Sequence, residues 1–78
     1  MKTITLYKDN NINNSFTISY VKLYNKFIKS NNFESFCKGT FDIKRAVSMF
    51  IAFDEKCSID NKDLEEFQVY CEQRWSRW

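Results

Sequence analysis

The stretch "SFTISYVKLYNKFI", residues 15–28, changes its hydrophobic period from two to about 3.6. Before Tyr20 the apolar side chains of Phe16 and Ile18 alternate with polar ones, which is typical of a β-strand. After Tyr20 the apolar positions follow helical spacing: Leu23, Tyr24, Phe27 and Ile28. We therefore expect an α+β fold.

The residues before this stretch predict a partner strand. "KTITLY", residues 2–7, alternates polar and apolar side chains and is rich in β-branched residues. "KDNNINN", residues 8–14, is a polar turn, because Asn and Asp tolerate left-handed backbone. Together with residues 15–20, these segments predict an N-terminal β-hairpin.

The middle of the chain predicts one helix and one ambiguous segment. The helix covers about residues 20–30 and is ended by "SNN". Residues 33–39 fit two interpretations. They are either a helical turn with Gly39 at the C′ position or a short third strand.

A central helix is predicted within "TFDIKRAVSMFIAFDEK", residues 40–56, with Thr40 or Asp42 as its N-cap. Its apolar residues cover a wide arc that is expected to face the core: Ile43, Ala46, Val47, Phe50, Ile51 and Phe53. On another side, Arg45 and Met49 form a candidate contact patch, because Arg and Met are enriched at protein interfaces. The alternative is an ordinary solvated surface.

The last helix is predicted to begin near Asp60 and to continue into "CEQRWSRW", residues 71–78. One of its faces forms a predicted core stripe: Leu64, Phe67, Cys71, Trp75 and Trp78. The tryptophans therefore favour packing over an exposed tail, although the terminal Trp78 is also a candidate contact residue. The neighbouring flank carries further candidate partner-binding residues: Tyr70, Arg74 and Arg77.

The chain has a formal net charge of +2, and its first half is more basic than its second half. Residues 1–39 carry six Lys against two acids, whereas residues 40–78 carry six Lys or Arg against eight acids. Three lysines of the first half share one helix face within roughly 60°: Lys22, Lys26 and Lys29. This basic stripe fits contacts with phosphates, contacts with an acidic protein surface, or a solvated face.

Residues with catalytic chemistry are scarce in this chain. It contains no histidine, and its three cysteines, Cys37, Cys57 and Cys71, are widely spaced. The chain therefore has neither a Cys–His pair nor the four Cys or His ligands of a structural zinc site. The odd number of cysteines predicts reduced thiols rather than a disulfide framework. We expect a single domain, residues 1–78, with no enzymatic activity, cofactor or metal.

The segment "FIAFDEKCSIDNKDLEEF", residues 50–67, resembles the helix–loop–helix of calcium-binding EF-hands. Asp54 to Ile59 is two residues shorter than that loop requires, and its central glycine is missing. Asp63 stands where the bidentate glutamate would be. The segment therefore predicts a turn between two helices, with Ile59 packed inward and Asp60 as a cap.

The composition also carries a hint of origin. Phe, Tyr, Met, Ile, Asn and Lys account for 38 residues, whereas Gly, Ala, Arg and Pro account for 6. The first group has AT-rich codons and the second has GC-rich ones. We therefore expect an AT-rich genome, such as that of a low-GC bacterium, a phage or another mobile element.

Together these features favour binding over catalysis. We expect a small cytoplasmic inhibitor or regulator that docks on a larger host protein or complex, of the phage anti-defence kind that includes anti-restriction and anti-CRISPR proteins. The alternative is a nucleic-acid-binding regulator that uses the lysine stripe, and a third hypothesis is an assembly component that forms homodimers. Because no apolar run reaches the roughly 20 residues of a membrane span, no membrane partner is expected.

Overall fold

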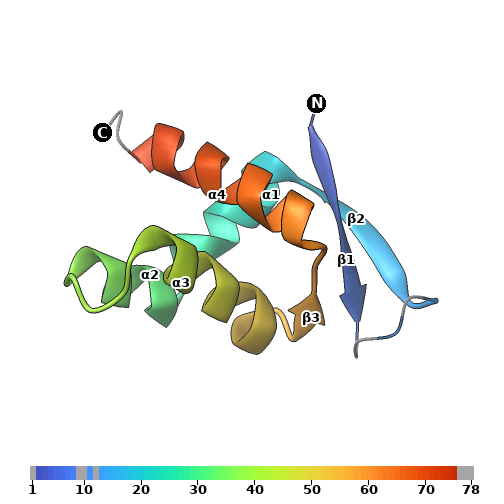
Figure 1. The fold of residues 1–78 in the computed structure, drawn as a ribbon, viewed down its shortest axis with the longest axis horizontal. Coiled ribbons are helices and arrows are strands. Elements are labelled where there is room, and N and C mark those ends of the chain that lie inside the picture. The colour runs from blue at the N-terminus through green and yellow to red at the C-terminus, as the bar shows by residue number, and fades with distance from the viewer. Residues whose placement is uncertain (1, 9–10, 12, 76–78) are drawn as a thin grey trace.

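The computed structural model describes residues 2–8, 11 and 13–75, which form a three-stranded sheet beside four α-helices (Figure 1). The strands are β1 (Thr3–Lys8), β2 (Ser15–Ser19) and β3 (Cys57–Ser58). The helices are α1 (Tyr20–Phe27), α2 (Asn31–Cys37), α3 (Ile43–Met49), its π-helical continuation η1 (Phe50–Asp54) and α4 (Asn61–Trp75). The predicted α+β class is confirmed, and the described residues contain four α-helices where about three were expected.

The N-terminal hairpin forms the larger part of the sheet. β1 pairs antiparallel with β2, from Thr3 opposite Ser19 to Tyr7 opposite Ser15. On its other side, β1 pairs antiparallel with β3 at Tyr7 and Lys8. The strand order is therefore β2-β1-β3, with β2 at one edge of the sheet.

The ambiguous segment at residues 33–39 is helical, and its end is a Schellman motif. The Thr40 amide donates to the Ser35 carbonyl at 2.9 Å, and the Gly39 amide donates to the Phe36 carbonyl at 3.0 Å. Gly39 has a φ of +83°, a left-handed conformation that glycine adopts without strain. The third strand therefore lies in the connection to α4 rather than at residues 33–39.

Side-chain caps fix where the helices begin. The Ser19 hydroxyl accepts a hydrogen bond from the Lys22 amide at 3.1 Å, which turns the strand into α1 at this point. The Asp42 carboxylate accepts from the Arg45 amide at 2.7 Å, so Asp42 is the N-cap of α3. Both caps supply an acceptor to a first-turn amide that no helical carbonyl can reach.

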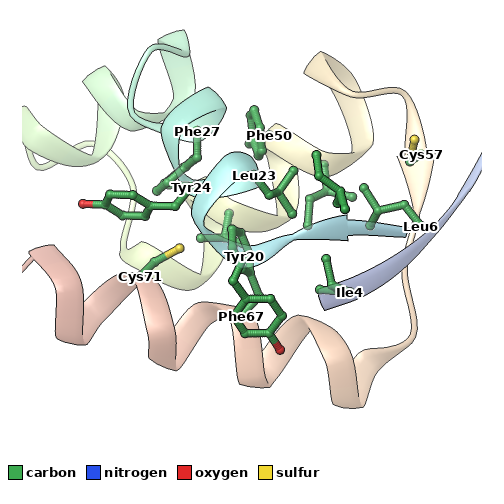
Figure 2. Packing of buried hydrophobic residues seen from close by; sticks show 14 of the residues in the cluster. Ile4, Leu6, Tyr20, Leu23, Tyr24, Phe27, Phe50, Cys57, Phe67 and Cys71 are labelled. Carbon is green, nitrogen blue, oxygen red and sulfur yellow. The ribbon is translucent and has the colours of Figure 1, made fainter. Parts of the chain in front are cut away.

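The core lies between the sheet and the helices, as Figure 2 shows. Its buried residues come from β1, β2, β3, α1, α3, η1 and α4: Ile4, Leu6, Ile18, Tyr20, Leu23, Tyr24, Phe27, Ile43, Ala46, Val47, Phe50, Ile51, Cys57, Phe67 and Cys71. Two edge-on or tilted ring pairs join its helices, Tyr20 with Phe67 at 5.5 Å and Phe27 with Phe50 at 5.4 Å between centroids. Within the described part of the chain, no helix has the length and apolar character that crossing a membrane requires.

Candidate protein-binding surface

Four side chains spaced by four residues run from the turn before α3 to η1; the first and third are half-buried, and the second and fourth are exposed. They are Phe41, Arg45, Met49 and Phe53, and we call them the α3 face. Residues i and i+4 of a helix lie one above the other, so Arg45 and Met49 are neighbours on the surface. The Arg45 guanidinium lies 5.1 Å from the centre of the Phe41 ring, in a cation–π contact. The face therefore combines two aromatic rings, a cation and a thioether.

Phe53 is the most exposed large apolar side chain of the described residues, with 64% of its surface accessible to solvent. The prediction that it faces the core is wrong, and η1 is the reason. The Glu55 amide donates to the Phe50 carbonyl at 3.0 Å, an i→i+5 bond that closes a π-helical turn. A wider turn advances each residue by less than the roughly 100° of an α-helix, which rotates Phe53 away from the core and towards the α3 face.

Two polar contacts tie the end of η1 to the preceding helices. The Asp54 carboxylate accepts from the Asn32 side-chain amide at 3.0 Å. The Glu55 carboxylate accepts from the Lys26 ammonium at 3.2 Å, and only 16% of the Glu55 side chain is exposed. These contacts join η1 to α1 and α2, so the turn that displays Phe53 is held from two directions. A side chain presented on a fixed backbone loses less entropy on binding than one on a loose loop.

The two contact residues predicted on α3 both lie on this surface. Arg45 is exposed and Met49 is half-buried. The sequence missed Phe53, which completes the row, because its position depends on the π-helical turn. π-Helical turns are often found at functional sites. However, no sequence pattern in "FIAFD" predicts a π-helical turn, so the sequence could not point to Phe53.

Tyr70 and Arg74 form part of an aromatic cluster, in which Tyr70 is half-buried and Arg74 is exposed. The half-buried Tyr70 ring lies edge-on to Tyr20 at 5.2 Å and to Tyr24 at 6.0 Å. The Arg74 guanidinium lies 5.5 Å from the Tyr24 ring centre and 5.8 Å from that of Tyr70. The Tyr70 ring therefore packs against α1, and Arg74 covers the cluster from outside.

Trp75 lies at the margin of the core and not within it. Its ring is 40% exposed and meets Phe36 of α2 edge-on at 5.3 Å. The earlier members of the predicted stripe are buried or packed against the core: Leu64, Phe67 and Cys71. The stripe prediction is thus confirmed for those residues and too strong for Trp75, while Arg77 and Trp78 fall outside the described residues.

The three lysines of the predicted stripe are all exposed, but they do not act as one row of equivalent cations. Lys26 is paired with Glu55, and Lys29 lies in the turn that follows α1. A cation that already has a carboxylate partner gains less from a phosphate. Lys22 and Lys29 are the better placed of the three for contact with nucleic acid.

A shallow hollow of about 340 Å³ lies between the start of the chain and α4, lined by Lys2, Glu65, Glu66 and Val69. Burial, followed by the Glu66 carboxylate, raises the pKa of the adjacent Tyr20 hydroxyl above its usual value. The hollow is open to solvent and lacks the enclosure that a small-molecule site provides.

Two of the three thiols, Cys57 and Cys71, are buried, and the acidic loop packs against the core through Ile59. Burial, and to a smaller extent Glu72, raises the pKa of the Cys71 thiol to about 12, so this cysteine is protonated and unreactive at neutral pH. Ile59 packs against the core, as predicted, and the Asp60 carbonyl accepts from the Leu64 amide at 2.9 Å. Among the described residues, no group of three or more His, Cys, Asp or Glu side chains is placed to hold a metal ion.

Comparisons of this chain with protein-family models, with curated proteins and with solved structures find no match. Its function must therefore be argued from the geometry of its own surface.

Proposed function

We propose that this protein is a non-enzymatic binding module that docks on a larger protein through the α3 face. The observation that carries the proposal is the exposure of Phe53, which is 64% accessible to solvent. It lies on a π-helical turn whose end is held by contacts with α1 and α2. Burying a phenylalanine side chain stabilises a complex by about 1.5–3 kcal/mol relative to leaving it in water. A small protein that displays such a side chain on a braced turn is well suited to insert it into a partner's pocket.

The neighbours of Phe53 suit the same role. Aromatic residues, Met and Arg are the residue types enriched in protein interfaces, and Phe41, Arg45 and Met49 supply one of each. Apolar anchors at i and i+4 are also how a helix lies in a groove of its partner. We take the row as the anchor of the interface and the surrounding polar residues as its rim.

The finer form of the proposal is an inhibitor of a host enzyme or defence complex, acting in the host cytoplasm. Its support is the composition, which is dominated by residue types with AT-rich codons, as expected of many phage and mobile-element proteins. Anti-restriction and anti-CRISPR proteins are the concrete examples of this class. The α3 face would then cover a functional surface of the target.

A photo-crosslinking experiment tests the docking face. The photoreactive analogue benzoylphenylalanine is placed at Phe53 in one variant and at Val69 in a second, and each is irradiated in lysate of a candidate host. Val69 is a matched control, because it is 47% exposed on α4, away from the α3 face. We expect one protein to crosslink at position 53 in stoichiometric amount and to be absent at position 69. Equal crosslinking at both positions, or none at 53, would contradict the proposal.

The nucleic-acid alternative makes a different prediction. It requires Lys22 and Lys29 to contact phosphates, so binding of DNA or RNA should weaken steeply with salt. A gel shift with these two lysines changed to Gln distinguishes it from the α3-face proposal. Salt-sensitive binding that is lost with the lysines and kept in Phe53→Ala would favour the regulator.

A further inference from the structure

The outer edge of β2 carries backbone groups that are not used within the sheet. At the two ends of the hairpin, the Tyr20 amide donates to the Lys2 carbonyl at 3.0 Å and the Lys8 amide donates to the Asn14 carbonyl at 2.8 Å. Hydrogen-bonded pairs alternate along an antiparallel ladder, so the even-numbered residues of β2 bond to β1. Ser15 and Thr17 therefore direct their backbone amides and carbonyls away from β1, and Ser19, whose carbonyl begins α1, directs its amide the same way. This is the side where β2 ends the sheet (Figure 1).

This edge lacks the features that normally block pairing with another strand. Natural edge strands carry Lys, Pro or a bulge, or are covered by another element. "NNINNSFTISYV", residues 10–21, contains no charged residue and no proline, although 28% of the chain is charged. The register with β1 runs without interruption along β2, so no bulge twists the edge away. β2 itself thus carries no charge, and the nearest cation is the Lys8 ammonium of β1, which lies 5.2 Å from the centre of the Phe16 ring.

The sequence of β2 is close to a palindrome. "SFTIS", residues 15–19, has Thr17 at its centre, an apolar residue on each side and a serine at each end. Read in the opposite direction, as an antiparallel neighbour would run, it presents the same pattern. A two-fold axis at Thr17 would place like residues opposite one another, which is how isologous interfaces are built.

We infer that this protein self-associates through β2, with a second copy adding its β2 antiparallel to the first and making one continuous six-stranded sheet. In this register the Thr17 residues of the two copies exchange backbone hydrogen bonds, and Ser15 lies opposite Ser19 of the second copy. On the core side, the half-buried Phe16 lies opposite Ile18 of the second copy and gains an apolar neighbour. No like charges meet across the seam, because β2 has none.

The inferred dimer is independent of the α3 face. The strand order places β1 and β3 between β2 and η1, so the two surfaces lie on different parts of the molecule (Figure 1). Each copy in the dimer would keep its α3 face open, and the dimer would be bivalent towards a partner. Because five residues a side bury a small area, the dimer should be weak and concentration-dependent.

Sedimentation velocity across about 10 µM to 1 mM protein tests the inference. We expect the average mass to rise from the 9.4 kDa of one chain towards twice that value. Thr17→Lys puts two like charges at the centre of the seam and should weaken association at least tenfold, as should Thr17→Pro, which removes the outward amide. Thr3→Lys is the matched control, because Thr3 is exposed on β1 and away from this edge. A mass of one chain at every concentration, or equal association of all variants, would overturn the inference.

A cysteine pair tests the register. In a Cys37→Ser background, Thr17→Cys should form a disulfide-linked dimer under mild oxidation, because paired residues on neighbouring strands lie about 5.5 Å apart between Cα atoms. Ser15→Cys should not crosslink to itself, since the two copies of Ser15 would lie about 13 Å apart, four residues along the strand. Crosslinking of Ser15→Cys with none of Thr17→Cys would exclude this two-fold arrangement.

Discussion

The end of η1 and the end of α4 each expose an aromatic side chain that helical periodicity assigns to the core. Phe53 has no ring contact with another described aromatic residue and is 64% exposed, whereas Trp75 is 40% exposed and packs edge-on against Phe36 of α2. The two reach the surface for different reasons. At η1 the helix changes its period, and at α4 the helix continues past most of the core.

This difference shows what a hydrophobic stripe can and cannot predict. A hydrophobic stripe predicts the direction of a side chain only while the helix keeps about 3.6 residues per turn, and this condition is not met at Phe53. It predicts that the side chain is buried only where another element covers it, and Trp75 is covered only in part. Phe53 is therefore exposed without a ring contact among the described residues, whereas Trp75 packs against Phe36 within the chain.

The largest effect on stability is expected from Phe50, the first residue of η1, the same π-helical turn that contains Phe53. Phe50 is buried against Phe27, so Phe50→Ala should lower the free energy of unfolding by about 3–5 kcal/mol through cavity formation. Phe53→Ala removes the same atoms from the surface and should change the free energy of unfolding by no more than about 0.5 kcal/mol. Urea unfolding monitored by circular dichroism measures both. Similar losses for the two would mean that Phe53 is covered in solution.

The second prediction concerns the buried half of α4. Cys71 has a pKa of about 12 when folded, against a usual thiol value near 9, because burial disfavours the thiolate. Below pH 9 both states hold the proton and stability is constant. Between about pH 9 and 12 only the unfolded state releases it, so stability should fall by up to about 1.4 kcal/mol per pH unit.

Unfolding midpoints measured at intervals from pH 8 to 11 check this decline. Cys71→Ala should reduce the decline, while Cys37→Ala, which removes an exposed thiol, should leave it unchanged. Part of the decline should persist above pH 10 in both variants, because the pKa of Tyr20 is also raised by burial and by Glu66. An unaltered curve for Cys71→Ala would show that this thiol is not protected in the folded state.

Trp75 should have an intermediate effect. We expect Trp75→Ala to lower the free energy of unfolding by about 1–2 kcal/mol, less than the 3–5 kcal/mol of a buried aromatic residue, because much of its ring already faces water. A double-mutant cycle with Phe36→Ala isolates the ring pair, which should contribute about 0.5–1.5 kcal/mol. A coupling near zero would show that the contact with Phe36 does not stabilise the fold.

The features that were predictable from the sequence are local. The caps at Asp42 and Gly39 and the N-terminal hairpin follow from residue types within a few positions of one another. The contacts that hold η1 are not local, since Lys26 and Glu55 are 29 positions apart and Asn32 and Asp54 are 22 apart. The periodicity of apolar residues does not predict which distant side chains form such pairs. The α3 face, which depends on these pairs, could therefore be predicted only in part.

The smallest effect is expected from the Tyr70 hydroxyl. Its oxygen is buried and has no hydrogen-bond partner among the described residues, although its ring packs well against Tyr20 and Phe67. Tyr70→Phe keeps the ring and removes a polar group that loses its water without compensation, so stability should rise by up to about 1 kcal/mol. Thermal unfolding measures the gain, with Tyr7→Phe on the sheet as a control. A loss of stability would reveal a hydrogen bond at this hydroxyl, and weaker partner binding with unchanged stability would make Tyr70 a contact residue after all.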